Sequence, residues 1–491
     1  MSKAELVRLF IQNNYLLKPG LLKLIPEMED YSCLVELAKK NITRQQHLTA
    51  ITEETLKSII CPPDGEGKKK TESCVGICCS YDKCSEKKDI QDFVKYFRAR
   101  YEGLRRILMP RTELQNAISI SRALEKPASE RVAIIGLVSD KAETRNGTVI
   151  LTIEDLTGTI KVMITKRNEE LIKAAQDIVL DEVIGIAGST ADKAIFANNI
   201  IFPEIPATKE LKKSPEEAYA AFISDIHVGS NMFLPDEFMK FINWINGNLG
   251  SEEQKATAMK VKYLFIIGDL VDGIGIYPEQ DKELLIKDIY EQYNKCAEYL
   301  SMIRKDINII ICGGNHDALR ISEPQPCLDR KYAKAIYSLP NVVTVSNPAL
   351  VNIHASPGFP GFDVLMYHGY SFDYYVANVS SIRNNGGYDR ADLIMRFLLQ
   401  KRHLAPTHGS TLYIPEKNYD PLIIDKVPDF FVTGHIHKAN ISDYKGVSTI
   451  SGSCWQAKTT FQEKVGHNPE PARVPIVNLR TRNIIMMRFD S

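Results

Sequence analysis

Five short motifs rich in Asp, Asn and His each follow an apolar run in the second half of this 491-residue chain. Each motif alone is common in loops and turns. Taken together and in this order, they predict a site for two metal ions that cleaves phosphate esters. The motifs are Asp225-Ile226-His227, Gly268-Asp269-Leu270-Val271-Asp272, Gly314-Asn315-His316-Asp317, Tyr367-His368-Gly369 and Gly434-His435-Ile436-His437.

The mixture of residue types fits two cations that share one ligand. Two ions held about 3.5–4 Å apart need a bridging carboxylate, and Asp269 is the candidate. Asp225, His227 and His437 are expected on one ion, and Asn315, His368 and His435 on the other. Five neutral ligands against two carboxylates leave a positive site that attracts phosphate. A water between the ions then loses its proton near neutral pH and attacks phosphorus in line.

Two further residues in these motifs are expected to act in catalysis without binding metal. His316 follows a ligand and is better placed as the general acid for the leaving alkoxide. Asp272 could orient that imidazole through its carboxylate. The nitrogen and oxygen ligands suit several ions. Mn²⁺ is the expected cofactor, with Fe, Co, Zn and Mg as alternatives.

Elements that would bring the motifs together are readable in residues 208–491, which alternate apolar strands with helices. Ligands that follow parallel strands meet at the carboxyl edge of a sheet. Each stretch between Asp225, Asp269 and Asn315 fits one crossover connection, so an α/β layered phosphoesterase domain is predicted. The expected strands are Tyr219–Ile223, Tyr263–Ile267, Ile307–Cys312, Val364–Tyr367 and Phe430–Val432, and the expected helices are Phe238–Leu249 and Leu284–Ile303.

Residues 126–207 show the alternation of a small β-barrel. Five short strands with one helix between the third and fourth are typical of an OB-fold, although another small barrel serving as a spacer would read similarly. The turn at Arg145-Asn146-Gly147-Thr148 suggests a type I′ hairpin. The expected strands are Val132–Val138, Thr148–Ile153, Thr159–Ile164, Val183–Ala187 and Ala194–Phe202, with a helix over Glu169–Gln176.

The first 125 residues divide into three parts. Helical spacing predicts a helical module over residues 1–60, and residues 91–125 read as a helical lead-in to the barrel. The polar, Gly- and Pro-containing stretch 61–90 is expected to be a strand-free linker. It contains the cysteines Cys74, Cys78, Cys79 and Cys84, whose spacing is irregular for zinc, so reduced thiols are the default.

Composition limits where the protein works and what it binds. There are 61 basic and 61 acidic residues, so net charge favours no nucleic acid and any binding face must be local. No apolar stretch reaches the roughly 20 residues of a membrane span, and the N-terminus does not read as a signal peptide. Ten scattered cysteines fit reduced thiols in the cytoplasm.

The motifs resemble those of the calcineurin-like metallophosphoesterases. Over residues 91–491 the chain is more closely similar to the small, exonuclease subunits of archaeal family D DNA polymerases. One departure is Asp373-Tyr374, where a pair of acids is expected, and it puts no ligand in doubt. Further segments carry the likeness: Gly314–Arg320 with Glu323-Pro-Gln-Pro326, Tyr367–Asp373, Lys401–Pro406, Ser451–Ala457 and Phe461–Lys464.

This resemblance implies a 3′→5′ exonuclease that proofreads for a separate large polymerase subunit in a heterodimer. Its substrate would be single-stranded DNA at a primer 3′ end. A basic run at Arg383, Arg390, Arg396, Lys401 and Arg402, interleaved with Tyr374, Tyr375 and Tyr388, would suit DNA, or it could be a solvated helix face. A phosphoprotein or nucleotide phosphatase and a non-catalytic scaffold subunit remain as alternatives.

Overall fold

The protein is described by a computed structural model over residues 15–17, 49–51, 75–81, 83, 87–166, 168–207 and 209–490. The chain forms two compact units, residues 1–72 and 73–491. In the first unit, β1 (Tyr15–Leu17) pairs in parallel with β2 (Thr49–Ile51). The helices predicted for residues 1–60 lie outside the described residues.

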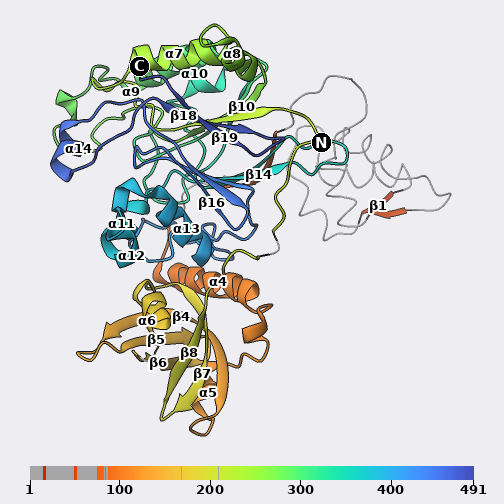
Figure 1. Ribbon diagram of the computed structural model, residues 1–491, viewed down its shortest axis with the longest axis vertical. Helices are drawn as coiled ribbons and strands as arrows, with labels where there is room; N and C mark the ends of the chain where they lie inside the picture. Colours follow the sequence, from red (N-terminus) through yellow and green to blue (C-terminus); the bar gives the residue numbers. More distant parts are fainter. Residues whose placement is uncertain are drawn as a thin grey trace. The chain divides into compact units, whose positions relative to one another are not determined.

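Two six-stranded sheets form the centre of the predicted phosphoesterase domain (Figure 1). The first has the order β12-β11-β10-β9-β18-β19, and its first four strands are parallel. Its strands are β9 (Tyr219–Ile223), β10 (Val261–Ile267), β11 (Asn308–Cys312), β12 (Val342–Thr344), β18 (Arg473–Asn478) and β19 (Ile484–Arg488). The second has the order β16-β17-β15-β14-β13-β3, with strands β3 (Val75–Ser80), β13 (Ala349–Ile353), β14 (Phe362–Met366), β15 (Phe430–Thr433), β16 (Asn440–Tyr444) and β17 (Val447–Ser451).

The central strands of the first sheet are largely apolar because both of their faces are buried. In β9, Ala220 and Phe222 point into the core between the two sheets, whereas Ala221 and Ile223 pack outward against helices. Successive side chains in a strand point to opposite faces, so a run without polar residues is what such a buried strand needs. The result is a rigid double layer whose strand ends can hold ligands.

Helices cover the outer face of each sheet (Figure 1). The first sheet is covered by α7 (Pro235–Ile245), α8 (Glu252–Met259), α9 (Ile289–Ser301) and α10 (Lys334–Tyr337). The second is covered by α11 (Phe372–Asn378), α12 (Ser380–Arg383) and α13 (Ala391–Lys401). The short elements η3 (Gln280–Lys282), η4 (Gly387–Asp389) and α14 (Thr460–Val465) lie in connections. No helix among the described residues is long and apolar enough to cross a membrane.

The preceding barrel is closed, in the strand order β4-β5-β6-β8-β7. One helix lies between the third and fourth strands, as expected from the sequence, and apolar side chains of all five strands fill the interior. The elements are β4 (Arg131–Glu143), β5 (Val149–Asp155), β6 (Gly158–Ile164), α6 (Glu169–Gln176), β7 (Val183–Ala191) and β8 (Ala194–Ile201). The helices before it are α4 (Ile90–Leu108), η2 (Thr112–Leu114) and α5 (Ile120–Leu124).

Helix α4 connects the barrel to the phosphoesterase domain. It begins with a capping box in which Asp89 accepts from the backbone of Asp92. One face packs on the barrel through Leu104 and Leu108. The other face carries Arg100, whose Nε donates to Asp420 over 2.7 Å with both side chains fully buried. A charge buried this way is tolerated only because it is paired and hydrogen-bonded.

The prediction of a strand-free linker over residues 61–90 is wrong for residues 75–80. They form β3, which pairs antiparallel with β13 at the edge of the second sheet. The backbone of Tyr81 then donates to Ser346, and its hydroxyl donates to Glu416. Cys78 and Cys79 lie in this strand as exposed free thiols. The sheet therefore continues into a segment whose composition suggested a linker.

Candidate metal centre

The predicted ligands come from the carboxyl ends of five strands. Asp225 follows β9, Asp269 follows β10 and Asn315 follows β11 in the first sheet. His368 follows β14, and His435 with His437 follows β15 in the second sheet. Parallel strands end at a common edge, so the two sheets present their ligands to one another there.

The backbone at this edge is unusual. Five of the seven predicted ligands have positive φ: Asp225 (51°), His227 (54°), Asp269 (52°), His435 (70°) and His437 (55°). Non-glycine residues in this region cost free energy and persist only where the surroundings enforce them. The chain bends sharply at each ligand, which lets several short turns fit around a small volume.

Two glycines in the motifs permit close approach. A Cβ on Gly314 would come within 2.2 Å of Asp269 Oδ1, and one on Gly434 within 2.6 Å of Asp225 Oδ2. Any side chain at these positions would displace a carboxylate of the centre. The glycines of the Gly-Asn-His-Asp and Gly-His-x-His motifs therefore belong to the site although they offer no ligand atom.

The first cluster contains Asp225, His227 and His437. His437 Nε2 lies 3.1 Å from His227 Nε2 and 3.4 Å from Asp225 Oδ1. His227 Nε2 lies 4.0 Å from the same Asp225 oxygen. Three potential ligand atoms thus face one point, as a transition-metal site with nitrogen and oxygen ligands requires.

The second cluster contains Asn315, His368 and His435. Asn315 Oδ1 lies 2.9 Å from His368 Nε2 and 3.0 Å from His435 Nδ1. Asp269 Oδ2 lies 3.3 Å from His368 Nε2 and 3.9 Å from His227 Nε2. Asp269 is therefore between the two clusters, where a bridging ligand would have to be.

Each ligand histidine has a polar partner on its other ring nitrogen. His227 Nδ1 lies 3.2 Å from Asp272 Oδ1, and His368 Nδ1 lies 2.9 Å from the carbonyl of Ile267. His435 Nε2 lies 3.0 Å from Asp373 Oδ2, and His437 Nδ1 lies 2.9 Å from Gln462 Nε2. Such partners fix the orientation of metal-binding imidazoles. They leave Nε2 of His227, His368 and His437, and Nδ1 of His435, facing the centre.

The carboxylates of the centre are buried yet ionised. Burial would raise the pKa of Asp269, but the neighbouring His368 and His316 hold it well below its ordinary value. Burial likewise opposes ionisation of Asp225, and contact with His437 outweighs it, so the pKa of Asp225 is lowered. Two buried anions among imidazoles form a donor set that fits divalent cations.

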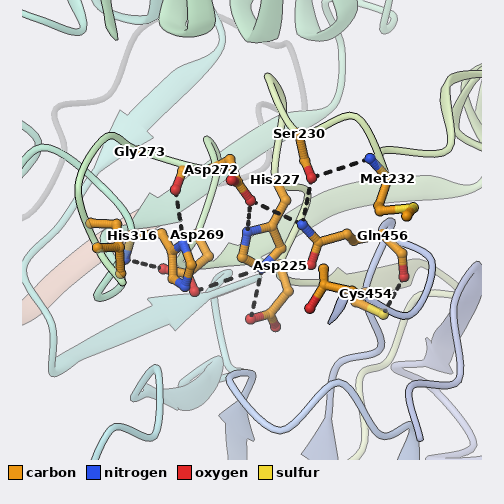
Figure 2. A network of polar contacts seen from close by, with 12 residues as sticks. Asp225, His227, Ser230, Met232, Asp269, Asp272, Gly273, His316, Cys454 and Gln456 are labelled. Atoms are coloured by element: carbon orange, nitrogen blue, oxygen red, sulfur yellow. Dashed lines mark hydrogen bonds and ion pairs between the residues drawn. The ribbon is translucent and has the colours of Figure 1, made fainter. Parts of the chain in front are cut away.

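His316 lies beside the centre, and Asp272 contacts it differently from the prediction (Figure 2). His316 Nδ1 donates to the backbone carbonyl of Asp272 over 2.8 Å. The Asp272 carboxylate instead contacts the ligand His227 and accepts from Gln280 and Gln456 over 2.9 Å each. The prediction that the Asp272 carboxylate orients His316 is therefore wrong, because the contact is made by the backbone carbonyl of Asp272. His316, with His227 and Asp269, also forms a group that could bind metal.

The predicted basic run divides into two sets. Lys401 and Arg402 are buried: Lys401 pairs with Glu182 over 2.7 Å, and Arg402 donates to the carbonyl of Ile424. They cannot contact DNA, so this part of the prediction is wrong. Arg383, Arg390 and Arg396 are exposed. Among the described residues, no cysteine joins a cluster that could hold a metal ion, and Cys74 and Cys84 lie outside the described part.

Apart from Asp272, the sequence did not indicate which residues contact the ligand histidines from behind. Asp373, on α11, and Gln462, on α14, come from elements that reach the centre only through the fold. The acidic residue at the Asp373-Tyr374 departure was the one available signal for the first of them.

Comparison with known proteins identifies the family to which the chain belongs. Residues 219–439 match the calcineurin-like phosphoesterase family, which gives the class of this domain. The chain is 42% identical to the DNA polymerase II small subunit of Methanothermobacter thermautotrophicus over 79% of its length and 78% of that protein. It is 37% identical to the corresponding protein of Archaeoglobus fulgidus, over 88% of this chain and 86% of that one. The chain belongs to the family of archaeal DNA polymerase II small subunits.

Two other matches are less complete or much weaker. The match to the Methanocaldococcus jannaschii small subunit, at 41% identity, covers 79% of this chain and 64% of that protein. Among solved structures, an archaeal phosphodiesterase aligns over 55% of this chain and 98% of its own, at 12% identity and a TM-score of 0.27. That score is too low to indicate a common fold across the whole chain.

Proposed function

We propose that this chain is a metal-dependent 3′→5′ exonuclease that acts on single-stranded DNA ends, as the small subunit of a two-subunit archaeal DNA polymerase in the cytoplasm. The observation that carries the proposal is the position of Asp269 between two clusters of ligand atoms. A bridging carboxylate with mixed nitrogen and oxygen ligands on each side is what two-metal phosphodiester cleavage needs. The names of the relatives supply the polymerase context.

Seven side chains would hold two divalent ions, with Mn²⁺ expected. Asp225, His227 and His437 would hold one ion, and Asn315, His368 and His435 the other, with Asp269 shared. When bound, the ions would lower the pKa of a water nucleophile and neutralise charge on the phosphate. The protein supplies the orientation, because each imidazole is held from behind.

His316 would act on the leaving group. Its Nδ1 is engaged by the Asp272 carbonyl, which leaves Nε2 for the substrate. As water adds to phosphorus, the bond to the 3′ oxygen of the preceding nucleotide breaks and His316 gives that oxygen a proton. The terminal nucleotide leaves as a 5′-monophosphate. Burial lowers the pKa of His316, so the imidazolium is a stronger acid than an exposed one.

The barrel would dock the large subunit, which is the expected partner. Leu156 and Phe196 are 58% and 41% exposed on its surface and are candidate contacts for that partner. Arg383 and Arg396 are exposed and could contact the DNA backbone. Arg390 is also exposed, but it pairs with Asp392 over 2.7 Å.

The direct test is cleavage of a single-stranded oligonucleotide with Mn²⁺ present. A 5′-labelled strand should shorten one nucleotide at a time and release nucleoside 5′-monophosphates, and chelation should stop the reaction. Asp269→Asn should lose at least 10³-fold in rate, roughly what essential catalytic groups cost, together with metal content, while circular dichroism stays unchanged. Hydrolysis of phosphomonoesters without cleavage of DNA would indicate a phosphatase and refute the proposal.

The His316 role has its own test. His316→Ala should keep both metal ions yet lose about 10²–10⁴-fold in rate on DNA. The loss should shrink on a nitrophenyl phosphodiester, because nitrophenolate leaves without a proton. Loss of a metal ion, measured by elemental analysis, would instead make His316 a ligand. Equal losses on both substrates would make it a positioning residue.

A further inference from the structure

A groove of about 570 Å³ opens directly beside the metal centre. We call it the His316 groove, because His316 lines it and also borders the centre. Its other walls include Ile274, Ile276, Leu319, Arg320 and Tyr332. A larger cavity of about 850 Å³ lies where α4 meets the barrel, and none of its lining residues belongs to the centre.

The wall formed by residues 273–276 is held in place by two buried glutamines. Gln292 accepts from Gly273 N over 2.9 Å and donates to its carbonyl over 3.1 Å. Gln280 accepts from Ile276 N and donates to both the carbonyl and the carboxylate of Asp272, over 2.8 and 2.9 Å. Gln280 therefore holds both the groove wall, through Ile276, and Asp272, which contacts His227 and His316. A ligand would meet a formed surface.

The lining favours an uncharged, flat group over a phosphate. Ile274 is 49% exposed although it is an apolar residue, and Ile276, Ile289 and Leu319 also line the groove. Arg320 is the cation among the lining residues, and it donates to the carbonyl of Pro324. Asp329 and Asp317 also line the groove. Asp317 is turned inward, where it accepts from Gly314 N and the Tyr293 hydroxyl. One engaged cation beside two carboxylates makes a poor phosphate site.

We propose that the His316 groove binds the nucleoside on the leaving side of the scissile phosphate, that is, the base and sugar of the penultimate nucleotide of a DNA 3′ end. This rests on the proposed function, in which His316 lies next to the departing 3′ oxygen. That oxygen belongs to the penultimate sugar, so its base must lie on the His316 side. The groove volume falls within the range of about 300–1,000 Å³ that is usual for small-ligand pockets.

Two substrates with the same scissile phosphate and terminal thymidine separate this proposal from others. One is a single-stranded oligonucleotide that ends in thymidine, and the other is the p-nitrophenyl ester of thymidine 5′-phosphate, which has no penultimate nucleoside. Ile274→Ser should lower kcat/KM on the oligonucleotide by about 5–20-fold, as loss of base packing does elsewhere. It should leave the ester unaffected. Ile485→Ser, at a residue 45% exposed on β19 and outside the groove, is the matched control and should change neither.

An abasic penultimate nucleotide supplies the reciprocal measurement. An abasic nucleotide at this position should lower the kcat/KM of the unsubstituted protein as much as Ile274→Ser lowers it on the normal oligonucleotide. Combining the abasic substrate with the Ile274→Ser variant should lower kcat/KM no further. If Ile274→Ser slows the ester equally, the groove holds the terminal nucleotide or the phosphate. If it slows neither substrate, the groove does not contact DNA. Either result overturns the inference while exonuclease activity stands. An unsubstituted protein that cleaves neither substrate refutes the exonuclease proposal itself, and the groove assignment falls with it.

Discussion

Asp373 holds His435 through Nε2 from the side away from Asn315, over 3.0 Å. Its side chain is 50% exposed, so replacing it should not unfold the protein. We predict that Asp373→Ala lowers metal affinity by about 10–100-fold, the usual cost of removing such a partner. Activity on DNA should fall at low Mn²⁺ and recover when Mn²⁺ is raised. Titration of activity against Mn²⁺ measures this shift.

Asp389 offers a matched control on the same surface. It is 69% exposed and pairs with Lys438 over 2.6 Å, but it contacts no ligand. Asp389→Ala should therefore leave the Mn²⁺ dependence unchanged. A Mn²⁺ titration of Asp373→Ala that overlays that of Asp389→Ala would show that His435 needs no carboxylate behind it.

Among single residues, the sequence predicts the metal ligands better than it predicts the residues that contact the ligand histidines from behind. Asp225, Asp269 and Asn315 could be named because each directly follows an apolar strand, and strand ends meet at one edge. Asp272 was paired with the wrong imidazole, because sequence proximity cannot tell which atoms of a sharp turn face which ring. Gln462 could not be predicted at all, since its contact depends on where α14 packs.

At the scale of elements, the position of β3 in the sheet predicts that removing this strand destabilises the domain. It supplies the outer strand beside β13, and Tyr81 links it to Ser346 and Glu416. Removing residues 1–74 should leave the thermal midpoint of the phosphoesterase domain within about 2 °C of the full chain. Removing residues 1–86 should lower it by several degrees, about 2–4 °C per kcal/mol lost in a domain of this size. Thermal unfolding followed by circular dichroism distinguishes the two.

Equal midpoints for both truncations would mean that β3 contributes nothing to the sheet. A large loss on removing residues 1–74 alone would mean that the first unit stabilises the second. Exonuclease activity should survive the shorter truncation in either case, because none of the seven predicted ligands precedes Asp225 and no described residue before it joins a possible metal cluster.

Most strand ends in the barrel lie within a few residues of the bounds predicted from the sequence. The type of the first hairpin turn and the existence of β3 were not predicted correctly. The Asn146-Gly147 hairpin forms, but only Gly147 has positive φ (70°), so the turn is not type I′. Gly147 N instead donates to Thr144 O, which places the turn one residue earlier. The strand β3 was missed because its pairing partner is far along the chain, and local composition carries no information about it.

At the scale of the whole molecule, a buried ion pair joins the barrel to the phosphoesterase domain. Lys401 ends α13 and Glu182 precedes β7, and their charged atoms lie 2.7 Å apart with both side chains about 98% buried or more. Burial lowers the pKa of Lys401 and raises that of Glu182, and each partner's charge opposes the shift of the other. The pair is therefore one specific contact between the two domains, and desolvating its two charges costs free energy.

Breaking this pair from one side should be worse than removing it altogether. Lys401→Met leaves the Glu182 carboxylate buried without its main cation and should destabilise the protein by about 3–5 kcal/mol. Adding Glu182→Leu removes the orphaned charge and should restore most of that loss, since two apolar side chains can pack in place of the pair. Chemical denaturation of both variants, with protease cleavage between the domains as a second probe, measures the difference.

Because neither Lys401 nor Glu182 lines the metal centre, the nuclease rate per folded molecule should stay the same in both variants. If the double variant is as unstable as the single one, the interface is held by the packing of Lys401 on Phe202 and Phe397, and the charges are incidental.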